Sequence, residues 1–273
     1  MTDPTYSSRL REIAADATRL VAADLVTAFR ATMHVDFKRD EHDPVTEHDR
    51  RAEQRIAEFL TSAVPGSTIV GEEGGRRDGT TGVTWYVDPI DGTANFAHGL
   101  AFFCTSIGAV VDGEIVAGAI LDPMAGTLFS ADQSGALLNG KPIRSTGVTD
   151  ESRAMLITSY PAARDIASDG EARLSLYADL VTAYGTVRRP GSAALSLAHV
   201  AAGWADAAMG TSVSAWDICA AKLIVEQAGG NYHGFRGEGW DQPAYVAYTA
   251  QLRPDALRKF VSSYGDGSAG PTW

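Results

Sequence analysis

The sequence predicts an α/β protein in which helices and sheets are stacked in layers. Its 273 residues, 45% of them hydrophobic, are enough for a sizeable core in one large domain or two modest ones. The first half contains strand-rich hairpins, and the second half alternates helical and strand patterns. Because each helix and each sheet has an apolar face to bury, stacked layers are the expected solution.

The N-terminal part begins with two helical patterns. Apolar residues recur at helical spacing over residues 8–30, and a second helix is expected over residues 47–62. A short strand at 68–70 leads into a polar, glycine-rich stretch that ends at residue 82 and is expected to form a mobile loop. The β-branched and aromatic residues at 83–87 predict the next strand.

Turn dipeptides divide the following segment into hairpins. Asp112-Gly113 separates two apolar runs within residues 104–121, and Asn139-Gly140 closes a later pair of short strands. Both dipeptides favour the left-handed backbone that two-residue hairpin turns require. We therefore expect these strands to continue one sheet.

A polar stretch at residues 144–152 is the predicted boundary between two lobes. The N-terminal lobe, residues 1–145, is α+β and carries most of the candidate metal ligands described below. The C-terminal lobe, residues 146–273, is α/β. Its expected elements are a strand at 155–159, helices at 171–183, 192–203 and 216–228, and an unstructured tail of nine residues.

Composition excludes several classes of function. The net charge of −11 and the pI near 4.9 argue against nucleic-acid binding, which needs basic patches. There is no signal-peptide pattern and no run of 18 apolar residues, so we expect no membrane partner. Cys104 and Cys219 stand in apolar surroundings without a close Cys or His, as buried thiols in a reducing compartment do. These features predict a cytoplasmic protein.

The DPIDGT stretch at residues 88–93 carries the strongest functional signal. Asp88 is expected to close a strand and Asp91 to open the next element, with a proline bending the chain between them. Two carboxylates in such a bend can hold a hard divalent cation. The backbone N–H groups of Gly92 and Thr93 can bind phosphate oxygens at a helix start. The stretch therefore indicates metal-assisted phosphate chemistry.

Three further acidic segments place an acid at the end of an element, in or beside a turn. Glu72 follows a short strand, Asp217 opens a helix, and Asp49 ends the turn DPVTEHD at 43–49, downstream of Lys38. Each has a simpler explanation as a solvated turn residue or a helix cap. Together they match phosphoryl chemistry in which two or more cations clamp the attacking and leaving oxygens.

Other hydrolase chemistries do not fit the motifs. Phosphatases of the haloacid-dehalogenase type carry Asp-x-Asp, whereas the two aspartates at 88 and 91 are three apart with a proline inside. A GxSxG elbow, an HExxH helix and a P-loop are absent, and the six histidines show no ligand spacing. These exclusions favour a site built from carboxylates.

The motifs resemble those of the inositol monophosphatase family. GEE at 71–73, DPIDGT at 88–93 and WD at 216–217 stand in the family's order, and DPVTEHD at 43–49 extends the resemblance to nearly the whole chain. The family belongs to the magnesium-dependent, lithium-sensitive phosphatases that include fructose-1,6-bisphosphatase. The resemblance implies an αβαβα sandwich that forms a homodimer and hydrolyses a small phosphate monoester.

The resemblance also implies which residues bind the metal. Two or three Mg²⁺ ions would be held by oxygen ligands, and one of the ions would activate the attacking water. A second ion would stabilise the leaving alkoxide. The positions that match the family's ligands are Glu72, Asp88, the Ile90 carbonyl, Asp91 and Asp217.

Catalytic and substrate-binding roles follow from the same resemblance. Thr93, paired with Asp49 and assisted by Glu72, matches the group that positions and deprotonates the attacking water. The positions that match substrate contacts are Asp91, Gly92, Thr93, Asp217 and the turn Gly191-Ser192-Ala193.

One position departs from the inositol-specific pattern. Seven residues before Asp217, inositol-specific members often carry a glutamate that bonds an inositol hydroxyl, whereas this chain has Gly210. We therefore expect an open, less acidic pocket there. Inositol 1-phosphate is the default substrate, and histidinol phosphate, a sugar phosphate and adenosine 3′,5′-bisphosphate are alternatives. A non-catalytic regulatory binding protein is a more remote alternative, because the full set of motif residues is present.

Overall fold

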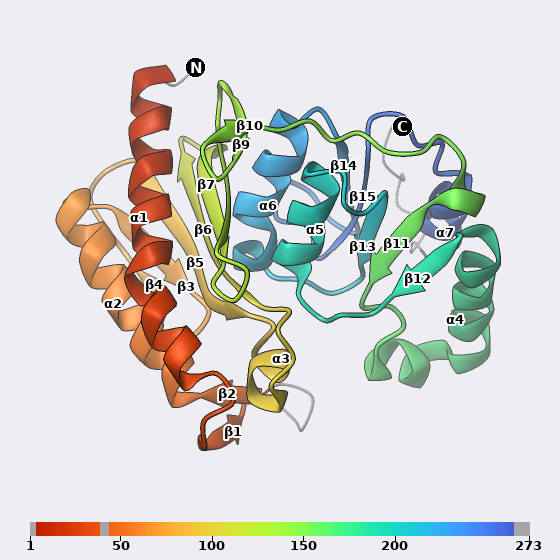
Figure 1. Cartoon of the computed structure of the whole chain (residues 1–273), viewed down its shortest axis with the longest axis horizontal. Helices are drawn as coiled ribbons and strands as arrows, with labels where there is room; N and C mark the ends of the chain where they lie inside the picture. Colours follow the sequence, from red (N-terminus) through yellow and green to blue (C-terminus); the bar gives the residue numbers. More distant parts are fainter. Residues whose placement is uncertain (1–3, 39–43, 265–273) are drawn as a thin grey trace.

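The structure is a computed structural model that describes residues 4–38 and 44–264. Its elements form five layers in the order helix, sheet, helix, sheet, helix (Figure 1). This arrangement confirms the predicted αβαβα sandwich. Asp43 of the acidic turn and the C-terminal tail lie outside the described residues.

The first helix layer consists of α1 (Pro4–Ala28) and α2 (Glu47–Ala63), which pack on one face of an eight-stranded sheet (Figure 1). The strand order of this sheet is β10-β9-β8-β7-β6-β5-β3-β4. A two-stranded ribbon and the short helix α3 (Thr93–His98) lie beside the sheet. The strands are β1 (Val35–Phe37), β2 (Pro44–Thr46), β3 (Thr68–Gly71), β4 (Gly75–Arg77), β5 (Val83–Asp91), β6 (Cys104–Val111), β7 (Glu114–Asp122), β8 (Thr127–Asp132), β9 (Gly135–Leu138) and β10 (Lys141–Pro142).

The two predicted hairpin turns are confirmed. Asp112 and Gly113 have φ angles of 52° and 84°, and Asn139 and Gly140 have φ angles of 48° and 77°. Positive φ at both central residues matches the right-handed twist of the flanking strands. Neighbouring strands from β5 to β10 are consequently antiparallel and follow one another in the sheet.

The second helix layer is formed by α5 (Ala193–Ala201) and α6 (Ala215–Gln227), which lie between the two sheets (Figure 1). The second sheet has the order β12-β11-β13-β15-β14, and α4 (Ala163–Ala183) and α7 (Asp255–Tyr264) cover its outer face. The remaining elements are β11 (Met155–Thr158), β12 (Thr186–Arg188), β13 (Ala207–Gly210), β14 (Asn231–Phe235), β15 (Ala244–Tyr248) and the short 3₁₀ helix η1 (Glu151–Arg153).

Three sequence expectations about elements were wrong. The stretch up to residue 82 contains the edge strand β4, which pairs with β3 although all three of its residues are exposed. The start of the first C-terminal helix was expected at residue 171, whereas α4 begins at Ala163. The earlier segment is mostly exposed, and a non-helical residue, Asp169 (φ −165°, ψ 78°), separates it from the helix that was expected. Strand β5 does not end at Asp88 but continues to Asp91, because its pairing with β6 resumes there after a bulge.

Each interface between layers has its own apolar core. Trp85 and Ile56 are fully buried between the first helices and the large sheet. Leu195 and Ile224 pack between the two sheets, and Phe260 lies against the outer face of the second sheet. Cys104 and Cys219 are buried free thiols, as expected. In the two described ranges, no helix has the length and apolar character needed to cross a lipid bilayer.

Candidate active site

The end of β5 carries the two aspartates of the DPIDGT stretch. The ladder with β6 is regular from Val83 to Asp88 and resumes only at Asp91, which pairs with Cys104. Pro89 has no N–H to donate, so the ladder is interrupted by a bulge. The Ile90 N–H donates instead to Asp88 Oδ1 at 3.0 Å. The bulge, and not the end of the strand, brings both carboxylates to one place.

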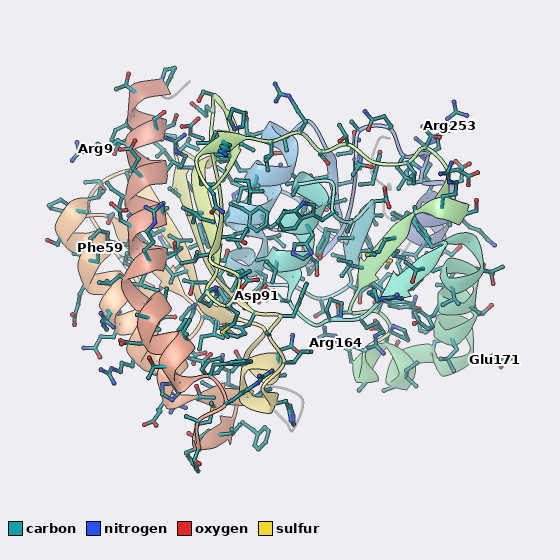
Figure 2. All side chains as sticks on the ribbon, viewed as in Figure 1. Arg9, Phe59, Asp91, Arg164, Glu171 and Arg253 are labelled. Carbon is teal, nitrogen blue, oxygen red and sulfur yellow. The ribbon has the colours of Figure 1, made fainter. Side chains whose placement is uncertain are left out.

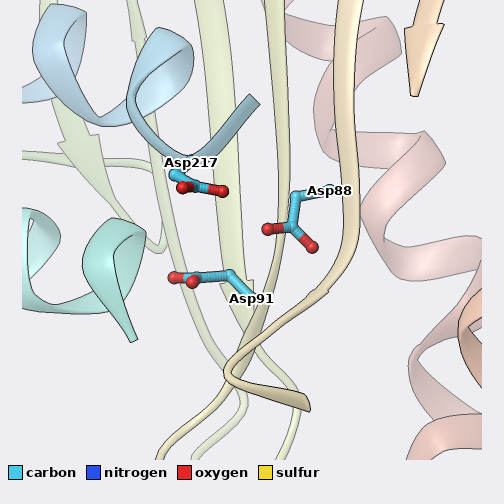
Figure 3. Close-up of side chains that lie close together, drawn as sticks. All are labelled: Asp88, Asp91 and Asp217. Carbon is cyan, nitrogen blue, oxygen red and sulfur yellow. The ribbon is translucent and has the colours of Figure 1, made fainter. Parts of the chain in front are cut away.

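The third carboxylate comes from the start of α6. Asp217 is the third residue of this helix, and its Oδ2 accepts the Ser214 N–H at 2.8 Å, which is a capping interaction. Helix α6 packs on the large sheet, including β5. One carboxylate oxygen each from Asp88, Asp91 and Asp217 therefore lies within 4.8 Å of the others (Figure 3). Asp217 thus caps α6 and also belongs to the carboxylate cluster.

No side-chain cation of the described residues neutralises the charges of this cluster. No lysine or arginine in the described ranges forms an ion pair with Asp88, Asp91 or Asp217. Burial and mutual repulsion raise the pKa of Asp217 to about 8 and hold the pKa of Asp88 well above its ordinary value. Burial raises the pKa of Asp91 to about 6. Three clustered carboxylate oxygens without a protein cation fit a hard divalent metal ion.

Asp91 also joins β5 to the second helix layer. Its carboxylate accepts the Ser192 hydroxyl, the Ala194 N–H at 2.7 Å and the Ala193 N–H at 3.2 Å. These donors stand at the N-terminus of α5, where a negative charge is favourable. The predicted substrate turn Gly191-Ser192-Ala193 consequently lies against the carboxylate cluster.

Thr93 and Asp49 are brought together from different elements. Thr93 Oγ1 lies 3.0 Å from Asp49 Oδ1 and 2.9 Å from the Ile90 carbonyl oxygen. Asp49 Oδ2 accepts the N–H and the hydroxyl of Thr46 at 2.8 and 2.6 Å, which caps α2. One oxygen of Asp49 thus fixes the helix and the other faces Thr93. Burial raises the pKa of Asp49.

Glu72, unlike the three aspartates, is not part of the tight cluster. Lys38 Nζ lies 2.8 Å from Glu72 Oε1 and also pairs with Glu73. The Glu72 charge is still close enough to raise the pKa of Asp88.

Gly92 adopts a φ of 98°, and a Cβ there would lie 3.0 Å from the Phe102 carbonyl oxygen. This left-handed residue leads from β5 into α3.

Two supporting residues were missed at the sequence level. Glu53 is buried, and its carboxylate accepts the Glu73 N–H at 2.8 Å and the Gly74 N–H at 2.6 Å. It lies four residues after Asp49, so helical spacing could have placed both on one face. Asn95 Nδ2 donates to the carbonyls of Phe102 and Pro190, which holds α3 against the turn before α5.

The expectation of an open pocket at Gly210 was wrong. Gly210 pairs across the sheet with Tyr245, and directly opposite residues share a face. A Cβ at Gly210 would lie only 2.7 Å from Tyr245 Cε1. Tyr245 is itself buried and stacked on Tyr232, with ring centroids 5.7 Å apart. The aromatic ring occupies the space that a side chain at 210 would need.

We expect Gly210→Glu to destabilise the protein because the new side chain collides with a buried ring. Overpacking of this kind costs about 1–3 kcal/mol, to which the burial of a carboxylate adds. The double variant Gly210→Glu with Tyr245→Val removes the collision and should recover a substantial part of the loss. Thermal unfolding of the wild type and both variants measures this. A stable single variant would show that the ring moves freely.

The chain matches known proteins along most of its length. The sequence profile described as "Inositol monophosphatase family" matches residues 7–262. The "Nus factor SuhB" of Pseudomonas aeruginosa is 38% identical over 204 residues, which are 73% of this chain and 75% of that protein. The protein of the same name from Escherichia coli K12 is 36% identical over 199 residues, 72% of this chain and 73% of that one.

Solved structures agree with these matches. SuhB of Bartonella henselae superposes with a TM-score of 0.82 at 29% identity, covering 94% of this chain and 98% of that one. Inositol monophosphatase from Anabaena superposes with a TM-score of 0.79 at 28% identity, covering 93% and 95%. Profile, sequence and fold agree, and the chain belongs to the inositol monophosphatase family.

Proposed function

We propose that this protein is a magnesium-dependent phosphomonoesterase acting on a small phosphorylated polyol, with inositol 1-phosphate as the first substrate to test. The observation that carries the proposal is the cluster of Asp88, Asp91 and Asp217, whose oxygens lie within 4.8 Å of one another without a protein cation. We assign the metal to these three aspartates, with Glu72 and the Ile90 carbonyl as further ligands.

The proposed mechanism gives each residue of the site a task. When bound, Mg²⁺ would supply neutralisation of the phosphate charge and activation of water. Thr93, whose hydroxyl donates to Asp49, retains lone pairs that can accept a proton from the attacking water. As that proton arrives, the hydroxyl proton passes to Asp49, whose raised pKa makes it a better acceptor. The Gly92 and Thr93 amides and the turn at 191–193 orient the substrate.

We expect Thr93→Ala to lower kcat by about 10²–10⁴-fold, the usual contribution of general base catalysis, with a smaller change in KM. The hydroxyl acts on the water, so its value lies in the transition state. Asp49→Asn should behave similarly, and the two changes together should cost little more than either alone. Steady-state kinetics at saturating Mg²⁺ measures all three variants.

Thr93→Ser is the matched control for this experiment. It keeps the hydroxyl next to Asp49 Oδ1 and removes only a methyl group, so it should retain most of kcat. If Thr93→Ala changes mainly KM, Thr93 is a phosphate-binding residue and the proton relay is wrong.

Substrate and metal are tested by phosphate release from a panel of monoesters. The panel contains inositol 1-phosphate, histidinol phosphate, a sugar phosphate and adenosine 3′,5′-bisphosphate. Activity should require a divalent cation and be higher with Mg²⁺ than with Ca²⁺, because the smaller ion holds a tighter geometry on oxygen ligands. Inhibition by lithium belongs to the same proposal and is measured in the same assay.

The name Nus factor carried by the SuhB relatives raises the alternative of a regulatory binding protein. The carboxylate cluster favours catalysis, because burying like charges together is costly unless they bind a cation. Failure of every monoester in the panel would favour the alternative.

Our proposal includes a cytoplasmic homodimer and two lobes that meet near residue 145. Sedimentation and limited proteolysis test the assembly and the lobe boundary.

A further inference from the structure

The cleft beside the aspartate cluster has a second wall that the proposed chemistry does not use. The cleft has a volume of about 200 Å³ and is lined on one side by Asp91 and Asp217. Its other side includes Ser159 and Ser212, which lie just after strands β11 and β13 of the second sheet, and Arg164, which lies in the first turn of α4. Asp91 and Arg164 lie near each other in the lower middle of the view (Figure 2).

The backbone that carries Arg164 is anchored. The next residue, Asp165, is buried and accepts the Ala162 N–H at 2.7 Å and the Tyr264 hydroxyl at 2.6 Å. Arg189 donates to the carbonyls of Ser159 and Pro161 at 3.1 and 2.8 Å, which ties the preceding loop to the segment before α5. Arg164 therefore projects from a fixed position relative to the cleft.

The guanidinium of Arg164 has donors to spare. Its Nη2 atom donates to the Ser212 carbonyl at 3.3 Å, and within the described ranges no carboxylate forms an ion pair with the guanidinium. By contrast, Arg11 and Arg50 each pair with an aspartate. A guanidinium offers five N–H donors in a fork that matches a carboxylate or a phosphate.

Apart from the two aspartates of the metal cluster, the polar side chains that line the cleft are neutral serine, threonine and tyrosine hydroxyls and the guanidinium of Arg164. Asp91 and Asp217 are the sole acids among the residues that line it, and both belong to the metal cluster. At Gly210 the Tyr245 ring fills the space of any further carboxylate. Apart from those two aspartates, Arg164 is the one charged residue that lines the cleft, and its charge is positive.

We propose that Arg164 binds a second anionic group, a carboxylate or a phosphate, on the leaving-group part of the substrate. This rests on the proposed phosphomonoesterase activity and narrows its substrate class. A leaving group with a cationic amine is disfavoured by the same charge. Arg164 is a specificity-determining residue and takes no part in breaking the P–O bond.

The test compares substrates that differ only in the second anion. Glycerol 3-phosphate is paired with 3-phosphoglycerate for a carboxylate, and fructose 1-phosphate with fructose 1,6-bisphosphate for a phosphate. The wild type should prefer one of the anionic partners by at least about tenfold in kcat/KM, the effect of a charged hydrogen bond. Arg164→Gln should bring that ratio close to one, and Arg164→Lys should retain part of it.

Arg253→Gln is the matched control, because Arg253 is exposed and lies at the far upper edge of the molecule (Figure 2). It removes the same charge and should leave the ratio unchanged. A wild-type ratio near one in both pairs overturns the proposal. An equal loss on both members of a pair in Arg164→Gln also overturns it, since that outcome indicates a general structural effect.

A binding measurement separates this proposal from the proposed activity. The same four compounds are titrated against wild type and Arg164→Gln by calorimetry with Ca²⁺ in place of Mg²⁺, which keeps turnover low during the titration. Stronger binding of the anionic partner that is lost in the variant supports the subsite even if no compound is hydrolysed. Turnover of all four compounds with equal affinities supports the phosphatase and rejects the subsite.

Discussion

Replacing Asp91 with asparagine is expected to remove nearly all phosphatase activity and also to lower the melting temperature in the presence of Mg²⁺. Loss of a direct ligand should cost more than the roughly 10–100-fold that loss of an outer-shell partner costs. The amide has a single acceptor oxygen for the Ser192, Ala193 and Ala194 donors. Losing a charged hydrogen bond costs about 1.5–3 kcal/mol, which corresponds to a fall of roughly 5 °C.

Asp217→Asn is the matched comparison. Its amide oxygen can still accept the Ser214 N–H, so the cap of α6 survives while the charge is lost. Activity should fall to a similar extent, with a smaller change in melting temperature. Circular dichroism melts and kcat/KM at saturating Mg²⁺ report the two effects separately. Near wild-type activity in Asp91→Asn would exclude this residue as a ligand.

The metal-free protein is expected to lose stability as the pH rises. The pKa values of Asp91 and Asp217 are about 6 and about 8 in the folded protein, above the ordinary value of 3.8. The folded state therefore binds these protons more tightly than the unfolded chain does. This stabilisation is complete below about pH 4 and is lost as the pH passes through 6 and 8.

Melting temperatures in EDTA between pH 5 and pH 9 measure this effect, and a fall of at least about 5 °C is expected. Mg²⁺ requires the ionised carboxylates, so the gain in melting temperature on adding Mg²⁺ should increase with pH over the same range. Asp217→Asn serves as the control and should flatten the curve in EDTA. A metal-dependent gain that is independent of pH would contradict the assignment of the ligands.

Local chemistry made much of the fold predictable. The Asp112-Gly113 and Asn139-Gly140 turns are determined by backbone preference, and the sequence therefore locates the hairpins. Strand β4 was not predictable, because its exposed residues are held by pairing with β3 alone. The early start of α4 has a local signal, because the Asp165 carboxylate accepts the Ala162 N–H three residues before it, but the segment is exposed and gives no apolar periodicity. The contact of Asp165 with Tyr264, which is distant in the chain, leaves no local pattern.

The parts of the site that come from one sequence motif were predictable. The parts whose positions depend on packing between distant segments were less so. The sequence could show that Asp88 and Asp91 share a bend, although the bulge itself depends on pairing with β6. Nothing local to Gly210 indicates that Tyr245 lies over it, because the two meet only through the antiparallel pairing of β13 and β15. The resemblance shows that the glutamate is missing at position 210, but it does not show that the Tyr245 ring occupies the space beside Gly210.

The origin of the three aspartates in two different layers has a consequence for how the protein becomes active. Asp88 and Asp91 stand on a strand of the first sheet, whereas Asp217 arrives only when α6 docks on that sheet. No partly folded form in which this helix is undocked can hold the complete cluster. During refolding, the packing around Trp85, which is buried on the opposite face of the large sheet, can be complete before catalysis recovers. Regained activity is thus a direct reporter of long-range assembly.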